Sequence, residues 1–287
     1  MKKIFLLCTI ALGLYACGSV PITGRRQLNL VSDDQVLTLS LQQYNDYLKT
    51  AKKSTDKMNT DLVVKVGQKI ADAVGAYFKA TGQEALIAEY KWEFNLMEDP
   101  QVNAFCMPGG KIVVYTGILP YTQNETGLAV VLGHEVGHAI AKHANERLSQ
   151  QMVTDYTGAA IGTALSGKSE KIQTISSTVY GLGTQVAVML PFNRKQELEA
   201  DHLGLILMAI AGYDANQAIP FWQRMSQQGS GTLELLSTHP SDNTRINEIQ
   251  KYLPEAMEYY TAIWGSGTTP ATSTPPKNGN TSTEWHF

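Results

Sequence analysis

The sequence predicts an α+β fold that is predominantly α-helical, with one small antiparallel sheet. Apolar residues recur at helical spacing over 60–78 and in a long series that starts at Glu125. Between these stretches, residues 91–97 alternate apolar and polar side chains, which is typical of a strand with one buried face. Two further short apolar runs flank the turn sequence 107–110, so a hairpin completes the predicted sheet.

The chain begins with the features of an export signal. Two lysines precede an apolar stretch, 4–14, that is shorter than the roughly 20 residues of a transmembrane helix but matches the core of a secretory signal. Ala16 and Cys17 follow as in a bacterial lipobox, in which lipid is attached to the cysteine. We therefore expect a signal peptide over 1–16 and lipid on Cys17; plain secretion and an uncleaved anchor are the alternatives.

This lipid would anchor the protein in a bacterial cell envelope, facing the periplasm. Gly18 and Ser19 follow the cysteine with no acidic residue, which favours the outer membrane by analogy with lipoprotein sorting in enterobacteria. Several acyl chains bind a membrane firmly, at about 0.8 kcal/mol for each buried methylene group. The membrane is thus one expected partner. Nucleic acid is not, because a net charge of −3 leaves no strongly basic surface to bind it.

After the leader, the sequence divides into three parts. Residues 17–31 are expected to form a connector and 32–264 one domain, whereas 265–287 are rich in Thr, Ser, Pro and Gly and are expected to be disordered. Ser32 starts the first helix of the domain as its N-cap. Residues 144–190 are rich in small residues but interrupted by charges, and are interpreted as packed helices or a mobile lid. Later helices are expected over 196–211, 215–227 and 242–252.

Two histidines and a glutamate form a pattern suited to metal chemistry. His134 and His138 are four residues apart, so on a helix they lie about 40° apart on one face and can bind the same zinc ion. Glu135 can then reach a water molecule at that ion. Gly133 and Gly137 allow other backbone to approach this helix closely. The alternative is a helix with two surface histidines.

A catalytic zinc ion needs three protein ligands and leaves its fourth position to water. The extended pattern with a third histidine requires glycine and histidine at two positions that Ala141 and Ala144 occupy here, so that class is excluded. His143 would point about 180° away from His134 on a continuous helix, and is interpreted as a surface histidine. The third ligand must then come from another segment.

A pair of acidic residues can supply this ligand. Glu197 and Asp201 are again four residues apart, so Glu197 can bind zinc while Asp201 accepts the N–H of a zinc-binding histidine. Ala200 and Gly204 are small enough for close packing against the first helix. Glu199 lies about 200° from Glu197 and is therefore not expected to affect the metal. The alternative is an acidic pair on a solvated helix face.

These motifs and two others resemble those of the gluzincin family of HtpX heat-shock proteases and CAAX prenyl endopeptidases. The resemblance covers about residues 30–253 and implies a zincin-type metallopeptidase domain with one zinc ion per chain. Many members carry transmembrane helices; this chain is more similar to the soluble periplasmic lipoprotein branch, which is implicated in envelope protein quality control. The matching residues are Asn103–Phe105, 108–110, His134–His138, Glu197–Asp201, Thr238–Pro240 and Arg245.

The resemblance implies roles for two further sites. The edge strand at Asn103 and Ala104 would pair with the backbone of an extended polypeptide substrate, with an ordinary hairpin as the alternative. His239 would lie near the zinc ion as a catalytic residue that donates to the developing oxyanion, or it would occupy the open ligand position in a resting state. A histidine that merely precedes a helix started by Pro240 is the alternative for this residue.

Together these features predict a zinc-dependent endopeptidase that hydrolyses unfolded or damaged envelope proteins, with Glu135 as the general base. One alternative is a chaperone-like lipoprotein that binds unfolded chains with little proteolysis. Another is a zinc hydrolase of a non-peptide substrate such as cell-wall material. The intact Glu135 argues against an inactive site, and the edge strand at Asn103 argues for a polypeptide substrate. The sequence indicates no particular oligomeric state.

Overall fold

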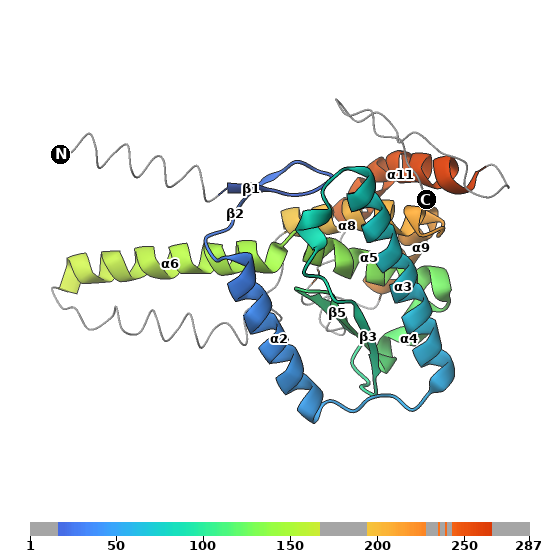
Figure 1. The fold of residues 1–287 in the computed structure, drawn as a ribbon, viewed down its shortest axis with the longest axis horizontal. Coiled ribbons are helices and arrows are strands. Elements are labelled where there is room, and N and C mark those ends of the chain that lie inside the picture. Colours follow the sequence, from blue (N-terminus) through green and yellow to red (C-terminus); the bar gives the residue numbers. More distant parts are fainter. Residues whose placement is uncertain (1–16, 167–193, 228–234, 236–238, 240–242, 266–287) are drawn as a thin grey trace.

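The computed structural model describes residues 17–166, 194–227, 235, 239 and 243–265. Helices account for most of these residues and pack against a three-stranded sheet, so the predicted α+β class with a predominance of α-helix is confirmed (Figure 1). A two-stranded hairpin lies at the N-terminal end. Within the described ranges, no helix is both long enough and apolar enough to cross a membrane.

The central sheet consists of β3 (Glu93–Met97), β4 (Ala104–Met107) and β5 (Lys111–Tyr115). Its strand order is β3–β5–β4, with β5 parallel to β3 and antiparallel to β4. The sheet is therefore mixed and not wholly antiparallel as expected. The difference arises because the tight turn after β4, with φ of 87° at Gly109 and 84° at Gly110, returns β5 between the two earlier strands. β4 is left at an edge of this sheet.

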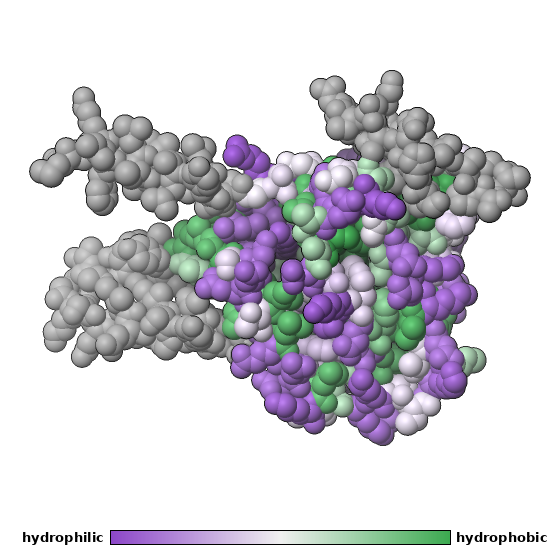
Figure 2. Space-filling view, in the orientation of Figure 1, coloured by the Kyte–Doolittle hydropathy of each residue, from purple (hydrophilic) through white to green (hydrophobic). Residues whose placement is uncertain are grey.

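Helices cover both faces of the sheet. α2 (Asp33–Thr50) begins at Ser32, which forms a capping box with Gln35, and it covers one face. α3 (Lys57–Ala80) and α5 (Glu125–Ile140) cover the other face. On the outer sides of α2 and α3, mostly polar side chains surround small apolar patches (Figure 2). The face under α2 carries Met97, Met107, Val113 and Tyr115. The face under α3 and α5 carries Leu96, Ile112 and Val114.

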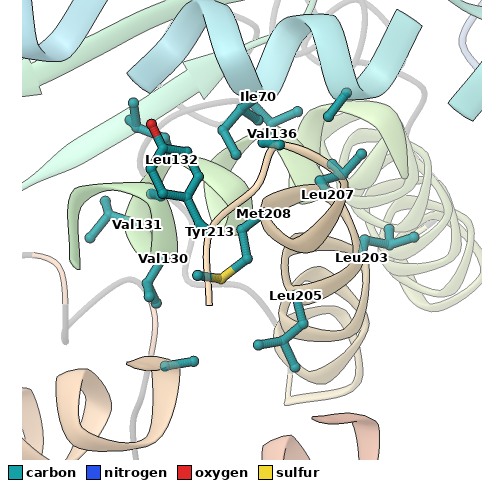
Figure 3. Close-up of a cluster of buried hydrophobic side chains, with 14 of the residues drawn as sticks. Ile70, Val130, Val131, Leu132, Val136, Leu203, Leu205, Leu207, Met208 and Tyr213 are labelled. Atoms are coloured by element: carbon teal, nitrogen blue, oxygen red, sulfur yellow. The ribbon is translucent and has the colours of Figure 1, made fainter. Parts of the chain in front are cut away.

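α8 (Arg194–Ile210) packs on α5 and completes the core. Small residues let the two backbones approach: a Cβ atom added at Gly137 would lie 2.7 Å from the carbonyl oxygen of Ala200, and one at Gly133 would lie 2.9 Å from that of Gly204. The close packing expected of these residues is thus present. Figure 3 shows apolar side chains of the two helices around this contact, namely Val130, Val131, Leu132 and Val136 from α5 and Leu203, Leu205, Leu207 and Met208 from α8.

The other helices frame this core. α6 (His143–Ser166) follows α5 and extends away from the body (Figure 1). It forms the first part of the stretch interpreted as packed helices or a lid; residues 167–190 of that stretch lie outside the described ranges. The remaining helical elements are η1 (Glu84–Ile87), η2 (Thr116–Ile118), α4 (Leu119–Thr122), η3 (Ala215–Gln217), α9 (Ala218–Ser226) and α11 (Asn243–Trp264).

The expected connector contains a hairpin of β1 (Cys17–Ser19) and β2 (Arg26–Leu28). Its loop is fixed to the domain, because Arg25 forms ion pairs with Glu146 of α6 and Glu199 of α8. The segment before helix α2 is thus packed structure and not a free linker. The predicted signal peptide and C-terminal tail fall outside the described ranges.

Candidate active site

α5 carries three polar side chains into the protein interior. Asn124 begins this helix by accepting a hydrogen bond from the backbone N–H of Gly127. His134, Glu135 and His138 are all buried. The Nε2 atoms of the two histidines are 3.1 Å apart, so both imidazoles converge on one point, as their four-residue spacing predicts. The alternative of two surface histidines is therefore wrong.

Glu197 of α8 reaches the same point. Its Oε1 lies 3.3 Å from Nε2 of His138 and its Oε2 lies 3.5 Å from Nε2 of His134. Burial by itself raises the pKa of this carboxyl, but the neighbouring His239, His134 and His138 outweigh burial and hold the pKa well below its usual value. Glu197 is therefore an ionised carboxylate in the core, which is the form that binds a metal.

Asp201 orients one of the two histidines. Its Oδ1 lies 2.9 Å from Nδ1 of His134, and its two oxygens accept hydrogen bonds from Arg245 at 2.6 and 2.8 Å. Burial raises the pKa of Asp201, but the guanidinium of Arg245 outweighs burial and the pKa is lowered. An ionised Asp201 accepts the Nδ1–H of His134 and so leaves Nε2 free to bind metal.

Arg245 also ties the site together from the other side. Its guanidinium lies 3.2 Å from Oε2 of Glu197 and donates to the carbonyl oxygen of His239 at 3.2 Å. The Cζ atom of the guanidinium also lies 3.6 Å from the centre of the Trp222 ring. In the sequence this residue was only part of the family resemblance. Its buried position among two carboxylates could not be read from helical spacing, because it comes from α11.

His239 is the fourth member of the cluster. Its Nδ1 lies 2.9 Å from Oε1 of Glu197 and 3.2 Å from Nε2 of His134, while its Nε2 lies 3.6 Å from Oε1 of Glu135. Its backbone N–H donates to the carbonyl oxygen of Leu235. Potential ligand atoms of His134, His138, Glu197 and His239 all lie within 4.8 Å of one another.

These four donors fit a zinc ion. Zinc binds nitrogen and oxygen at about 2.0–2.2 Å in a tetrahedron, which places neighbouring ligand atoms roughly 3.3 Å apart. Here His239 Nδ1 lies 2.9 Å from Oε1 of Glu197 and His134 Nε2 lies 3.5 Å from its Oε2, and one candidate ligand atom from each of the four residues lies within 4.8 Å of the others. Three imidazoles and one carboxylate also suit zinc better than calcium or magnesium, which prefer oxygen ligands. The three predicted ligands are thus brought together, with His239 as a fourth donor.

Glu135 lies beside the cluster but is not part of it. Its side chain is buried, and Oε1 has no hydrogen-bond partner among the described residues. Burial raises the pKa of this carboxyl, while the nearby His239 and His134 oppose that effect. A buried carboxylate with an open lone pair and a raised pKa is suited to exchanging protons with a bound molecule.

A cleft of about 620 Å³ leads to this point. Glu135, His138 and His239 line it, and β4 borders it. The carbonyl oxygen of Asn103 accepts a hydrogen bond from the backbone N–H of Tyr115, and that of Met107 accepts one from Gly110. The backbone groups of residues 103, 105 and 107 therefore face β5. By the alternation of a β-ladder, the backbone groups of residues 104 and 106 point away from β5, and both residues line the cleft.

Asn103 has a different position from the one expected. Its own backbone faces β5, and its side-chain Oδ1 accepts the backbone N–H of Ala104 at 2.9 Å. Ala104 and Cys106, by contrast, direct their backbone groups away from β5, and both residues line the cleft. Register explains this difference, because a one-residue shift turns every backbone group to the opposite side of a strand.

His143 was expected at the surface but is fully buried. Its Nδ1 lies 2.8 Å from Nδ1 of His138, and its Nε2 lies 2.9 Å from Oε2 of Glu199. The expectation failed because the helix is not continuous: α5 ends at Ile140 and α6 starts at His143, after Lys142 with φ of 55°. This break turns His143 back toward the metal-binding side, and counting 100° per residue across it gives the wrong face.

Comparisons with known proteins point to one family. The sequence profile described as "Peptidase family M48" matches residues 68–253. "Mitochondrial metalloendopeptidase OMA1" of Schizosaccharomyces pombe is 35% identical over 249 residues, which cover 83% of this chain and 67% of that protein. "Metalloendopeptidase OMA1, mitochondrial" of Homo sapiens is 29% identical over 247 residues, covering 83% and 46%. "Beta-barrel assembly-enhancing protease" of Yersinia pestis is 29% identical over 180 residues, covering 60% and 36%.

These relatives correct the expected localisation. The proteins from Schizosaccharomyces pombe, Saccharomyces cerevisiae, Arabidopsis thaliana and Homo sapiens are all named as mitochondrial. A lipoprotein on a bacterial outer membrane does not fit this group, so the predicted localisation was wrong. The prediction that the substrates are envelope proteins depended on that localisation and is no longer supported. The error arose because a short apolar stretch followed by one cysteine is too simple a pattern to identify a lipoprotein signal by itself. The lipid on Cys17 and the membrane partner had no other support.

The family and the cofactor follow from independent observations. The matched profile spans α5 and α8 and thus all three predicted metal ligands. Candidate ligand atoms of these residues and of His239 lie within 4.8 Å of one another at one buried point, where they could hold a zinc ion. The chain belongs to peptidase family M48 and is a zinc metalloendopeptidase.

Proposed function

We propose that this endopeptidase hydrolyses unfolded or damaged polypeptides that bind in extended form, and that Glu135 carries the protons of the reaction. The observation that carries the proposal is the position of Glu135. Its buried Oε1 lacks a hydrogen-bond partner within the described part of the chain and lies at a cleft that a sheet edge borders. A base next to a strand edge suits a peptide bond, because an extended backbone can pair with that edge.

The site residues divide the chemistry between them. Zinc, when bound by His134, His138 and Glu197, supplies a Lewis acid that activates water and polarises the scissile carbonyl. Glu135 accepts the proton of the attacking water, and it then delivers this proton to the leaving amine. The position of Glu135 suits both transfers, because its buried Oε1 has no hydrogen-bond partner among the described residues.

His239 occupies the fourth donor position in this structure. A catalytic zinc site needs an open position, whereas a site with four protein ligands is closed. We infer that the structure corresponds to a resting arrangement and that His239 must move away before water and substrate can bind. The 2.9 Å distance between its Nδ1 and Oε1 of Glu197 supports this role more than a primary role as oxyanion donor.

Substrate would bind along β4. The backbone groups of Ala104 and Cys106 point away from β5, and a peptide that pairs with them would lie over Glu135 as an added strand. Asn103 would help by releasing the N–H of Ala104, which its side chain holds at 2.9 Å in this structure. Main-chain pairing does not depend on side-chain identity, so it suits an enzyme that accepts varied unfolded segments.

Substitution of Glu135 by Gln tests the proposal. The amide has nearly the same shape but cannot accept a proton, so turnover on unfolded casein should fall by about 10²- to 10⁴-fold while the protein keeps one zinc ion per chain. Casein cleavage and zinc content are measured on the same samples. Glu125→Gln is the matched control: Glu125 starts the same helix but pairs with Lys65 at the surface, so its loss should leave turnover unchanged.

Two outcomes would contradict the proposal. Wild-type turnover in Glu135→Gln would show that another group carries the protons. A wild-type protein that suppresses aggregation of unfolded casein and never cleaves it would restore the chaperone-like alternative. In either case zinc content shows whether the site was loaded, so a failure of metal binding cannot be mistaken for a failure of the mechanism.

A further inference from the structure

The two zinc-binding histidines are supported in different ways. A histidine that binds zinc through one ring nitrogen usually donates its other N–H to a carboxylate, a carbonyl or water, which fixes its orientation. His134 follows this pattern, because Asp201 accepts from its Nδ1 at 2.9 Å. At His138 the group that faces Nδ1 at 2.8 Å is a second imidazole, that of His143.

The proton positions along this contact follow from the metal site. His138 directs Nε2 at the cluster, 3.3 Å from Glu197, so when it binds zinc its proton must be on Nδ1. His143 must then accept that N–H with its own Nδ1, which puts the proton of His143 on Nε2. That nitrogen lies 2.9 Å from Oε2 of Glu199, a carboxylate oxygen that accepts it. Each bond therefore fixes the next tautomer.

The N-terminal hairpin completes this series of bonds. In the loop between β1 and β2, Thr23 donates to Oε1 of Glu199, and Arg25 donates from Nε to Oε2 of Glu199 at 2.6 Å. The other two nitrogens of Arg25 bind the two oxygens of Glu146, each at 2.7 Å. Gln196 also donates to Glu146, at 2.8 Å. The side chains of Arg25, Glu146 and Glu199 are no more than 13% exposed.

We propose that His143, Glu199 and Arg25 are positioning residues that hold His138 in its zinc-binding tautomer and orientation. The hairpin of residues 17–28 is then a working part of the zinc site. It contributes Arg25 from outside residues 68–253, the range that the family profile matches. These residues are proposed to affect zinc affinity, which does not depend on the proposed substrate class.

A role in folding alone would not require this arrangement. Buried ion pairs are weak contributors to stability, because the cost of removing two charges from water offsets their attraction. An anchor for the hairpin would be complete with Arg25, Glu146 and Glu199. The contact between Nδ1 of His143 and Nδ1 of His138 is not needed to hold the hairpin in place. It does connect these ion pairs to a proposed metal ligand.

The tautomer of His143 can be tested in the wild-type protein. With zinc bound and histidines labelled with ¹⁵N, the NMR shifts of the ring nitrogens report which nitrogen carries the proton. We expect a protonated Nε2 and an unprotonated Nδ1 in His143, together with a protonated Nδ1 in His138. A protonated Nδ1 in His143 would overturn the proposal, because that imidazole could not accept from His138.

Variants of the full chain test the effect on metal binding. Zinc affinity is measured by competition with a chromogenic chelator, and thermal unfolding of the zinc-free protein is measured beside it. His143→Leu removes the acceptor and should weaken zinc binding by about 10- to 100-fold. His143→Asn places an amide oxygen where Nδ1 was and should recover part of the loss. Glu199→Gln and Arg25→Gln act through His143 and should give progressively smaller losses.

The matched control is Glu255→Gln. Glu255 pairs with His202 of α8 at 2.6 Å, so this change removes a similar ion pair from the same helix. Zinc affinity should not change in this variant. Equal affinity in His143→Leu and wild type would refute the proposal, as would equal losses in His143→Leu and His143→Asn. Losses that merely follow the thermal stability of the zinc-free proteins would show a structural role only.

Discussion

At the scale of single residues, we propose that His239 decides whether the zinc site is open or closed. With Nδ1 2.9 Å from Glu197 and 3.2 Å from His134, it lies where water must bind for catalysis. A working site that exists only when His239 has moved is populated for a fraction of the time, and activity is reduced by that fraction. On this proposal, the single histidine limits the activity of the other catalytic groups.

Replacement of His239 by Ala should therefore give an enzyme with higher turnover on casein than wild type, with zinc still bound by three ligands. Turnover and zinc content are measured together, and His202→Ala, which removes a histidine from the ion pair with Glu255, is the control. A drop of about 10²- to 10³-fold would instead identify His239 as an oxyanion donor, because this is the usual effect of removing one such group.

At the scale of elements, the contact between α5 and α8 sets the distance between the ligands on the two helices. A Cβ atom at Gly137 would meet the carbonyl oxygen of Ala200 at 2.7 Å, and this backbone oxygen cannot turn away. Gly137→Ala should push the helices apart, move Glu197 away from His138 and cost about 1–3 kcal/mol of stability. Chemical denaturation and zinc affinity measure the two effects.

Gly75→Ala is the matched control for this substitution. Gly75 lies within α3, and a Cβ atom there would have no neighbour within 4 Å. The same chemical change should therefore raise stability by about 0.5–1 kcal/mol, because alanine favours the helix more than glycine does. If Gly137→Ala were as stable as Gly75→Ala and bound zinc as tightly as wild type, the helix contact would not set the ligand geometry.

The elements also show what the sequence could and could not predict. Local patterns were sufficient for the start of α2 at Ser32, for the strands, and for His134 and His138 on one face, because spacing and capping act over a few residues. Strand order was not predictable, because alternation does not say which strands pair. The break at Lys142 was also not predictable from local patterns. Its positive φ separates α5 from α6, so the side on which His143 lies cannot be calculated from the spacing in one continuous helix.

At the scale of the whole molecule, distant segments build one site. The predicted ligands come from α5 and α8, and Arg245 comes from α11 (Figure 1). The proposed support from Arg25 comes from a hairpin over a hundred residues before them. Such long-range assembly explains why helical spacing identified the ligands but not their supports. It also makes metal binding depend on the complete fold, because unfolded chains hold no preformed site.

We propose that zinc is bound by His134, His138 and Glu197. Zinc content of the purified full chain, expressed as ions per protein, tests it most directly. We expect one zinc ion per chain in wild type and in Glu255→Gln, and almost none in Glu197→Ala, because a lost ligand should cost at least the 10- to 100-fold in affinity that a lost supporting residue does. A Glu197→Ala protein that folds and retains a full zinc ion would contradict the claim.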